Sequence, residues 1–145
     1  MPLPPQKFRE MVFQLLYSRL FGASEPADMV PMLMAELRVT KNSVCKAVQR
    51  AEAIEAHFDQ LDPQIASASP NYRFERISGV EKTILRLALY ELLHDPTLPS
   101  RVAMAEAMRL TRKFGTPESA KFVTAILDVI HCSQKDAAAN PSTPL

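Results

Sequence analysis

Histidine, cysteine and carboxylate side chains are the residues of this chain that could carry metal or redox chemistry. His57, His94 and His131 stand singly, in no spacing typical of a metal-ligand motif. Cys45 and Cys132 lie far apart and form no pair motif, so we expect both to be buried, reduced thiols. The sequence therefore predicts neither a metal site nor redox chemistry.

Nucleotide and acid–base chemistry also lack their usual residues. The chain has 3 glycines, which form no phosphate-cradling loop of either common type. Glu106 and Glu118 are the candidate carboxylate pair for general acid–base catalysis, but single glutamates on helices usually belong to solvated faces. We predict a protein that is not an enzyme and needs no cofactor.

The elements that must position any site are helices, because apolar residues recur at three- and four-residue steps along most of the chain. The strongest pattern is at 80–93, where apolar side chains cover nearly the whole circumference, so we expect this helix at the centre of a bundle. Thr40, Ser78, Ser100 and Thr116 are the expected N-caps of four of the helices. The expected helices are 6–21, 29–37, 40–58, 61–69 (short and weak), 78–93, 100–115 and 116–133.

With no convincing strand, the sequence predicts an all-α protein, a compact single-domain bundle of about seven helices. We expect residues 1–133 to form the domain and residues 134–145, rich in alanine, proline and serine, to be a disordered tail. Neither a signal peptide nor an apolar run of membrane-spanning length is evident, which predicts a cytoplasmic protein without a membrane partner.

Charge is unevenly distributed although the net charge is only +1. Residues 1–22 and 70–121 carry an excess of basic side chains, whereas residues 23–69 carry an excess of acidic ones. If the two basic stretches met in space they would make one positive face, so the near-neutral total does not exclude a nucleic-acid partner.

Residues 80–93 read VEKTILRLALYELL. This motif resembles the V-E-K-x-I-L-R-x-A-x-Y-E-L of the NusB family of bacterial transcription antitermination factors. The likeness continues in register at 99–104 (PSRVAM), 113–115 (KFG) and 121–123 (KFV), and Arg9 with 14–18 (QLLYS) resembles the family's start. Residues 23–69 match the family only in helical layout.

The resemblance implies binding of boxA-type single-stranded RNA in nascent ribosomal RNA transcripts, together with the small-subunit ribosomal protein that acts as NusE, within the RNA polymerase antitermination complex. It implies partner-binding positions at Glu81, Lys82 and Arg86. Cations at the RNA site would neutralise phosphates and aromatic rings would stack on unpaired bases. The RNA-binding positions that the resemblance implies are Lys7, Arg9, Tyr17, Lys113, Phe114, Glu118, Lys121 and Phe122.

Other interpretations of these residues are also compatible with the sequence. The aromatic residues at the implied RNA site are also explained by core packing, and Glu81 by the preference for carboxylates at a helix start. The first helix has fewer basic residues than the family's arginine-rich one, which fits a protein-only adaptor that keeps the NusE-binding surface and has little RNA affinity. Ribosomal RNA cytosine methyltransferases carry a NusB-like domain, but this chain has no room for their catalytic part. Both a monomer and a homodimer are compatible with the sequence.

Overall fold

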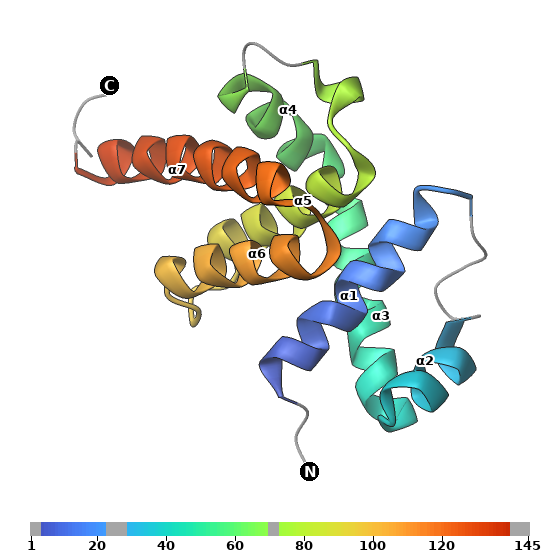
Figure 1. Cartoon of the computed structure of the whole chain (residues 1–145). Coiled ribbons are helices and arrows are strands. Elements are labelled where there is room, and N and C mark those ends of the chain that lie inside the picture. The colour runs from blue at the N-terminus through green and yellow to red at the C-terminus, as the bar shows by residue number, and fades with distance from the viewer. Residues whose placement is uncertain (1–3, 23–28, 70–72, 140–145) are drawn as a thin grey trace. The chain divides into compact units, whose positions relative to one another are not determined.

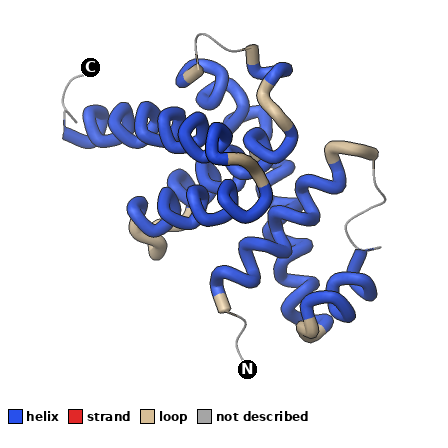
Figure 2. The backbone as a smooth tube through the Cα atoms, in the orientation of Figure 1, coloured by secondary structure: helices blue, strands red, loops and turns tan. Residues whose placement is uncertain are grey.

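The computed structural model describes residues 4–22, 29–69 and 73–139, and within these ranges the chain is helical with no strand (Figure 2). The predicted all-α class is therefore confirmed. The helices group into two compact units, which are described separately below: unit 1 is Met1–Phe58 and unit 2 is Asp59–Leu145.

Unit 1 is built on α3, against which both α1 and α2 pack. Thr40 caps α3 as predicted, because its Oγ1 accepts a hydrogen bond from the Ser43 backbone N–H at 3.1 Å. Arg38 ends α2 in the left-handed conformation with φ 53°, a place more often taken by glycine. The three helices are α1 (Pro5–Arg19), α2 (Val30–Leu37) and α3 (Lys41–Ala56).

Unit 2 is built on α5, against which α6 and α7 pack while also packing on each other. Ser78 and Glu81 close a reciprocal capping box at the start of α5, so the predicted cap is confirmed. Side-chain hydrogen bonds from Arg86 to Asp62 and between His94 and Gln60 join α5 to α4. The elements are α4 (Phe58–Ala68), the short 3₁₀ helix η2 (Phe74–Arg76), α5 (Gly79–His94), α6 (Ser100–Phe114) and α7 (Pro117–Ala139). The four α-helices are labelled in Figure 1.

Several predicted helix boundaries were wrong: α1 ends at Arg19 and not at 21, and α4 starts at Phe58 and not at 61. The helix expected to end near Phe58 ends at Ala56, because the His57 backbone N–H turns to the Ile54 carbonyl at 2.9 Å and α4 starts one residue later. Ser100 is the first residue of α6, and Pro99 takes the cap position with extended backbone. Finally α7 continues to Ala139, past the expected end at Ser133.

The extension of α7 has a local cause. Residues 134–139 read QKDAAA, which are mostly strong helix formers, so a helix already held by packing can propagate through them. The rest of the predicted tail, residues 140–145, lies outside the described residues.

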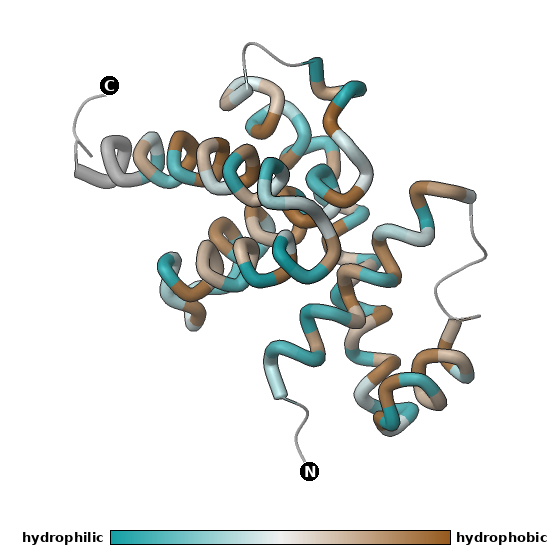
Figure 3. The backbone as a smooth tube through the Cα atoms, viewed as in Figure 1, coloured by the Kyte–Doolittle hydropathy of each residue, from teal (hydrophilic) through white to brown (hydrophobic). Residues whose placement is uncertain are grey.

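The core of unit 2 surrounds α5, which confirms its predicted central place. Ile84, Leu85 and Leu89 are 0% exposed. Hydropathy alternates along the outer helices α6 and α7, as expected for helices with one face against a core (Figure 3). Among the described residues, Thr83 Oγ1 is the one buried side-chain oxygen or nitrogen without a hydrogen-bond partner.

Replacing Thr83 by Val tests this arrangement. The two side chains have the same shape, so the change removes an unpartnered hydroxyl, which costs about 1–3 kcal/mol when buried, and leaves the packing in place. We expect Thr83→Val to raise the free energy of unfolding by about 1 kcal/mol in urea denaturation. A loss of stability would show that the hydroxyl has a partner in the folded protein.

Candidate nucleic-acid interface

The residues of α1 that the family pattern implies as RNA-binding are largely engaged within unit 1. Lys7 Nζ donates a hydrogen bond to the Leu37 backbone oxygen at 3.1 Å, which ties α1 to the end of α2. Arg9 is only 8% exposed. The guanidinium of Arg19, one of the basic residues of this stretch, pairs with Glu55 at 3.2 Å. The positive charge of α1 is therefore mostly committed to contacts inside the chain.

Tyr17, the aromatic member of the α1 set, belongs to a ladder of rings at four-residue spacing. Its ring stacks on Phe13 with centroids 5.5 Å apart and 12° between planes. On its other side it meets the edge of Phe21, with centroids 5.0 Å apart. Phe21 is 69% exposed, so the ladder runs from the core of unit 1 to its surface.

The turn between α6 and α7 brings the other implied RNA residues together. Gly115 is required there, because a Cβ at this position would lie 2.9 Å from the Thr111 backbone oxygen. Thr116 Oγ1 then accepts a hydrogen bond from the Ser119 backbone N–H at 3.1 Å, which confirms the predicted cap of α7. The chain thus reverses within two residues.

Side chains of mixed character surround this turn. Lys113 is exposed and its Nζ lies 5.8 Å from the centre of the Phe114 ring, a cation–π contact. Phe114 and Phe122 are half-buried. Glu118, in the first turn of α7, and Lys121, one turn later, are exposed. Unit 2 therefore presents basic and aromatic groups close together.

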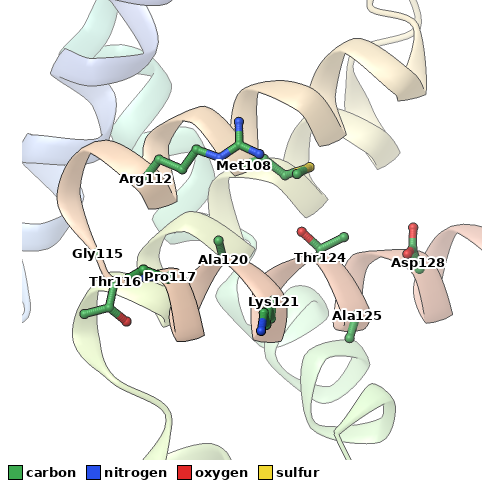
Figure 4. A pocket seen from close by; sticks show the side chains of 10 residues that line it. All are labelled: Met108, Arg112, Gly115, Thr116, Pro117, Ala120, Lys121, Thr124, Ala125 and Asp128. Carbon is green, nitrogen blue, oxygen red and sulfur yellow. The ribbon is translucent and has the colours of Figure 1, made fainter.

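A groove of about 650 Å³ runs between α6 and α7; we call it the α6–α7 groove. Arg112 and Lys121 reach it from opposite helices, and Thr124 and Asp128 lie further along α7 (Figure 4). Neither Arg112 nor Lys121 has a hydrogen bond or ion pair with the part of the chain that the structure describes. The groove is lined by Met108, Arg112, Gly115, Thr116, Pro117, Ala120, Lys121, Thr124, Ala125 and Asp128.

The implied partner-binding residues on α5 all make contacts inside unit 2. Glu81 completes the capping box, and Lys82 Nζ lies 4.4 Å from the centre of the Phe74 ring. Arg86 is 8% exposed and donates two hydrogen bonds of 2.8 Å to both oxygens of Asp62. Glu81 and Lys82 remain partly exposed, whereas the geometry gives Arg86 a structural role, that of joining α5 to α4.

Two expectations about reactive side chains were wrong. Glu106 is not on a solvated face: it is 8% exposed and accepts two hydrogen bonds from the Arg109 guanidinium, at 3.0 and 3.2 Å. One turn of helix brings that arginine within reach, which makes burial of the carboxylate tolerable. Cys132 is exposed and Cys45 half-buried, and both are free thiols. Cys132 is exposed because it lies on the side of α7 away from Val123 and Ile130, the core residues of this helix.

The described ranges contain no group of three or more His, Cys, Asp or Glu side chains that could hold a metal ion. None of the helices described combines the length and apolar character needed to cross a membrane.

Sequence reasoning missed Arg112 and Asp128 at the groove and Phe21 at the end of the α1 ladder. The four-residue spacing of Phe13, Tyr17 and Phe21 was a usable signal, because such residues share a helix face. The two groove residues gave no such signal, since nothing in the sequence says which faces of α6 and α7 lie together.

Comparison with known proteins gives a consistent result. The family model described as "NusB family" matches residues 6–131. The transcription antitermination protein NusB of Chlamydia pneumoniae is 35% identical over 88% of this chain and 79% of its own length. That of Geobacter sulfurreducens is 34% identical over 88% of this chain and 94% of its own length.

Solved structures agree with the sequence relatives. T. maritima NusB superposes with a TM-score of 0.77 at 29% identity, covering 90% of this chain and 92% of that one. A chain from a crystal structure of the antitermination factors NusB and NusE in complex with double-stranded RNA shares the fold, with a TM-score of 0.74 at 22% identity over 88% of this chain and 96% of its own. The chain belongs to the NusB family.

Proposed function

We propose that this chain is a transcription antitermination factor that binds boxA-type RNA of nascent ribosomal RNA transcripts together with the ribosomal protein in the NusE role. It would act in the cytoplasm, within the RNA polymerase antitermination complex, by binding and not by catalysis, with residues 1–133 working as one domain. Membership of a family whose members are named antitermination proteins supports this role, as does the fold shared with a NusB chain crystallised with NusE and RNA.

The observation that carries the proposal is the surface around the α6–α7 turn. Lys113 and Lys121 are exposed beside the half-buried rings of Phe114 and Phe122. Cations neutralise phosphates without regard to sequence, and a ring with one free face stacks on an unpaired base. The exposed carboxylate of Glu118 adds an acceptor for base amino groups.

On α5 we assign the NusE-binding contact to Glu81 and Lys82, which stay partly exposed. Arg86 would serve that surface indirectly. Its pair with Asp62 fixes α4 against α5, and its Cζ lies 5.5 Å from the centre of the Phe74 ring. Breaking such a buried pair leaves an uncompensated charge, so Arg86 is a positioning residue in this proposal.

A second candidate is the protein-only adaptor, favoured by the state of the α1 cations. Lys7, Arg9 and Arg19 are hydrogen-bonded, buried or paired. With those charges committed, α1 releases few counterions on meeting RNA, so the gain in affinity from α1 is small.

The two candidates are separated by fluorescence anisotropy of a labelled boxA-like single strand titrated with the full chain, with and without the purified partner ribosomal protein, at two salt concentrations. We expect salt-sensitive binding that the partner strengthens. The same RNA annealed to its complement is the matched control for recognition of unpaired bases. Partner binding without any RNA contribution would select the adaptor.

Phe122 provides a test of stacking. We expect Phe122→Ala to weaken RNA binding about tenfold, because stacking on an aromatic ring contributes about 1–3 kcal/mol per base. Phe122→Leu is the matched control, since leucine keeps apolar volume and lacks the ring. If leucine restores affinity, or if alanine abolishes the helical circular dichroism signal, Phe122 serves packing and the stacking role is refuted.

Lys7 provides a test of the α1 surface. We expect Lys7→Gln to reduce the slope of log affinity against log salt measurably, but by less than the value of about 0.7 for one full phosphate contact on a single strand, because its ammonium already donates to the Leu37 carbonyl. Lys41→Gln, at an exposed lysine of the same unit, controls for loss of charge. Equal slopes for the variant and the unaltered chain would remove Lys7 from the RNA surface.

A further inference from the structure

The cations of α5, α6 and α7 divide into engaged and free ones. Arg86 pairs with Asp62, and Arg109 pairs with Glu106. Lys82 and Lys113 lie over the rings of Phe74 and Phe114. By contrast, Arg101, Arg112 and Lys121 are exposed, and the described part of the chain offers them neither a hydrogen bond nor an ion pair; of these, Arg112 and Lys121 line the α6–α7 groove. Their charge is available to an outside anion.

Arg112 and Lys121 both line the α6–α7 groove, one on each helix. Two cations on separate helices that line one groove can hold a phosphate better than one flexible lysine, because both charges attract the anion. The groove between them is lined by Met108 and by the small side chains Ala120 and Ala125. Apolar walls of this kind suit a flat heterocycle more than an extended charged chain.

Asp128 gives the groove a second, chemically different end. It lies seven residues after Lys121, two turns along the same face of α7 and about 10 Å away at 1.5 Å per residue. Its exposed carboxylate has no partner among the described residues. Thr124, between the two, adds a hydroxyl that can donate or accept. The groove thus offers cations at one end and hydrogen-bond acceptors at the other.

We propose that the α6–α7 groove holds one unpaired guanine nucleotide of the RNA. The phosphate lies between Arg112 and Lys121, the base lies against Met108 and Ala120, and the Asp128 carboxylate accepts hydrogen bonds from the guanine N1–H and N2–H groups. Guanine is the base whose Watson–Crick edge presents two neighbouring N–H donors, which match the two oxygens of a carboxylate. The volume of about 650 Å³ falls within the range of about 300–1,000 Å³ usual for small-ligand sites.

This inference rests on the proposed RNA binding and adds a site and a base preference to it. An acidic protein segment is the competing occupant, because it would also satisfy Arg112 and Lys121. The carboxylate of Asp128 disfavours that occupant, since it would repel acidic side chains lying along the groove. RNA avoids the conflict because its negative charge sits on the phosphate while its base donates to the carboxylate.

The test uses the full chain and a labelled oligouridine with a single central guanosine, compared with the same RNA carrying inosine, which lacks the N2 amino group. We expect inosine to weaken binding to the unaltered chain about tenfold, and to have little effect on Asp128→Asn. We also expect Arg112→Gln and Lys121→Gln each to lower the salt slope by about 0.7. Arg101→Gln, at an exposed cation near the start of α6, is the matched control and should change neither quantity.

The outcomes separate the groove from the proposed function. If the unaltered chain binds the RNA while Arg112→Gln behaves like Arg101→Gln, the groove assignment is overturned and RNA binding stands. An equal loss with inosine in Asp128→Asn and in the unaltered chain overturns the guanine contact. If no RNA binds, with or without the partner ribosomal protein, both proposals fail; competition by an acidic peptide that Arg112→Gln abolishes would then assign the groove to a protein segment.

Discussion

Burial of α5 is the constraint on which unit 2 depends. A helix apolar on nearly every side has to be covered on every side, and α4, α6 and α7 of this unit all contact it. Because α5 is covered in this way, a charged side chain on it needs a partner within the chain. Arg86, 8% exposed, is therefore held by both oxygens of Asp62, a bidentate geometry that lysine would not reproduce. The same contact fixes α4, so one ion pair serves both burial and placement.

The packing of α6 and α7 on α5 also determines which of their side chains face outward. Because α6 and α7 both turn their apolar faces to α5 and pack on each other, their outward faces meet along one line. Small residues follow that line on α7, namely Ala120, Thr124 and Ala125, and leave room that larger side chains would fill. The tight turn at Gly115 brings the last turn of α6 next to the first turn of α7. The groove is thus a consequence of the core and of side-chain size together.

Much of this fold could be predicted from the sequence. Apolar periodicity located the helices, and the caps at Thr40, Ser78 and Thr116 were readable because a capping hydrogen bond spans only three residues. Helix boundaries that depend on weak local preferences were harder to predict. The end of α3 at Ala56 depends on one backbone turn at His57, and the extension of α7 depends on helix propensity beyond its packed part.

The candidate site was less predictable for a physical reason. A sequence shows which residues are cationic but not which of them have a partner in the folded chain. Arg9 and Lys113 look alike in the sequence, yet one is buried and the other exposed. Ion pairs within one helix, such as Arg109 with Glu106, are suggested by their spacing, whereas the freedom of Arg112 and Lys121 emerges only when α6 and α7 are in place.

Because the net charge of the chain is only +1, the local charges matter more for the proposed RNA binding than the net charge does. At physiological salt the screening length is about 8 Å, so a chain of this net charge attracts RNA weakly at a distance. The proposed affinity for RNA then has to arise at short range, from stacking, from phosphates held between cations and from directed hydrogen bonds. Such binding depends less on salt than binding by a strongly basic surface, because fewer counterions are released. It also gains more from a partner that adds contacts to the same RNA, as the proposed pairing with the ribosomal protein would.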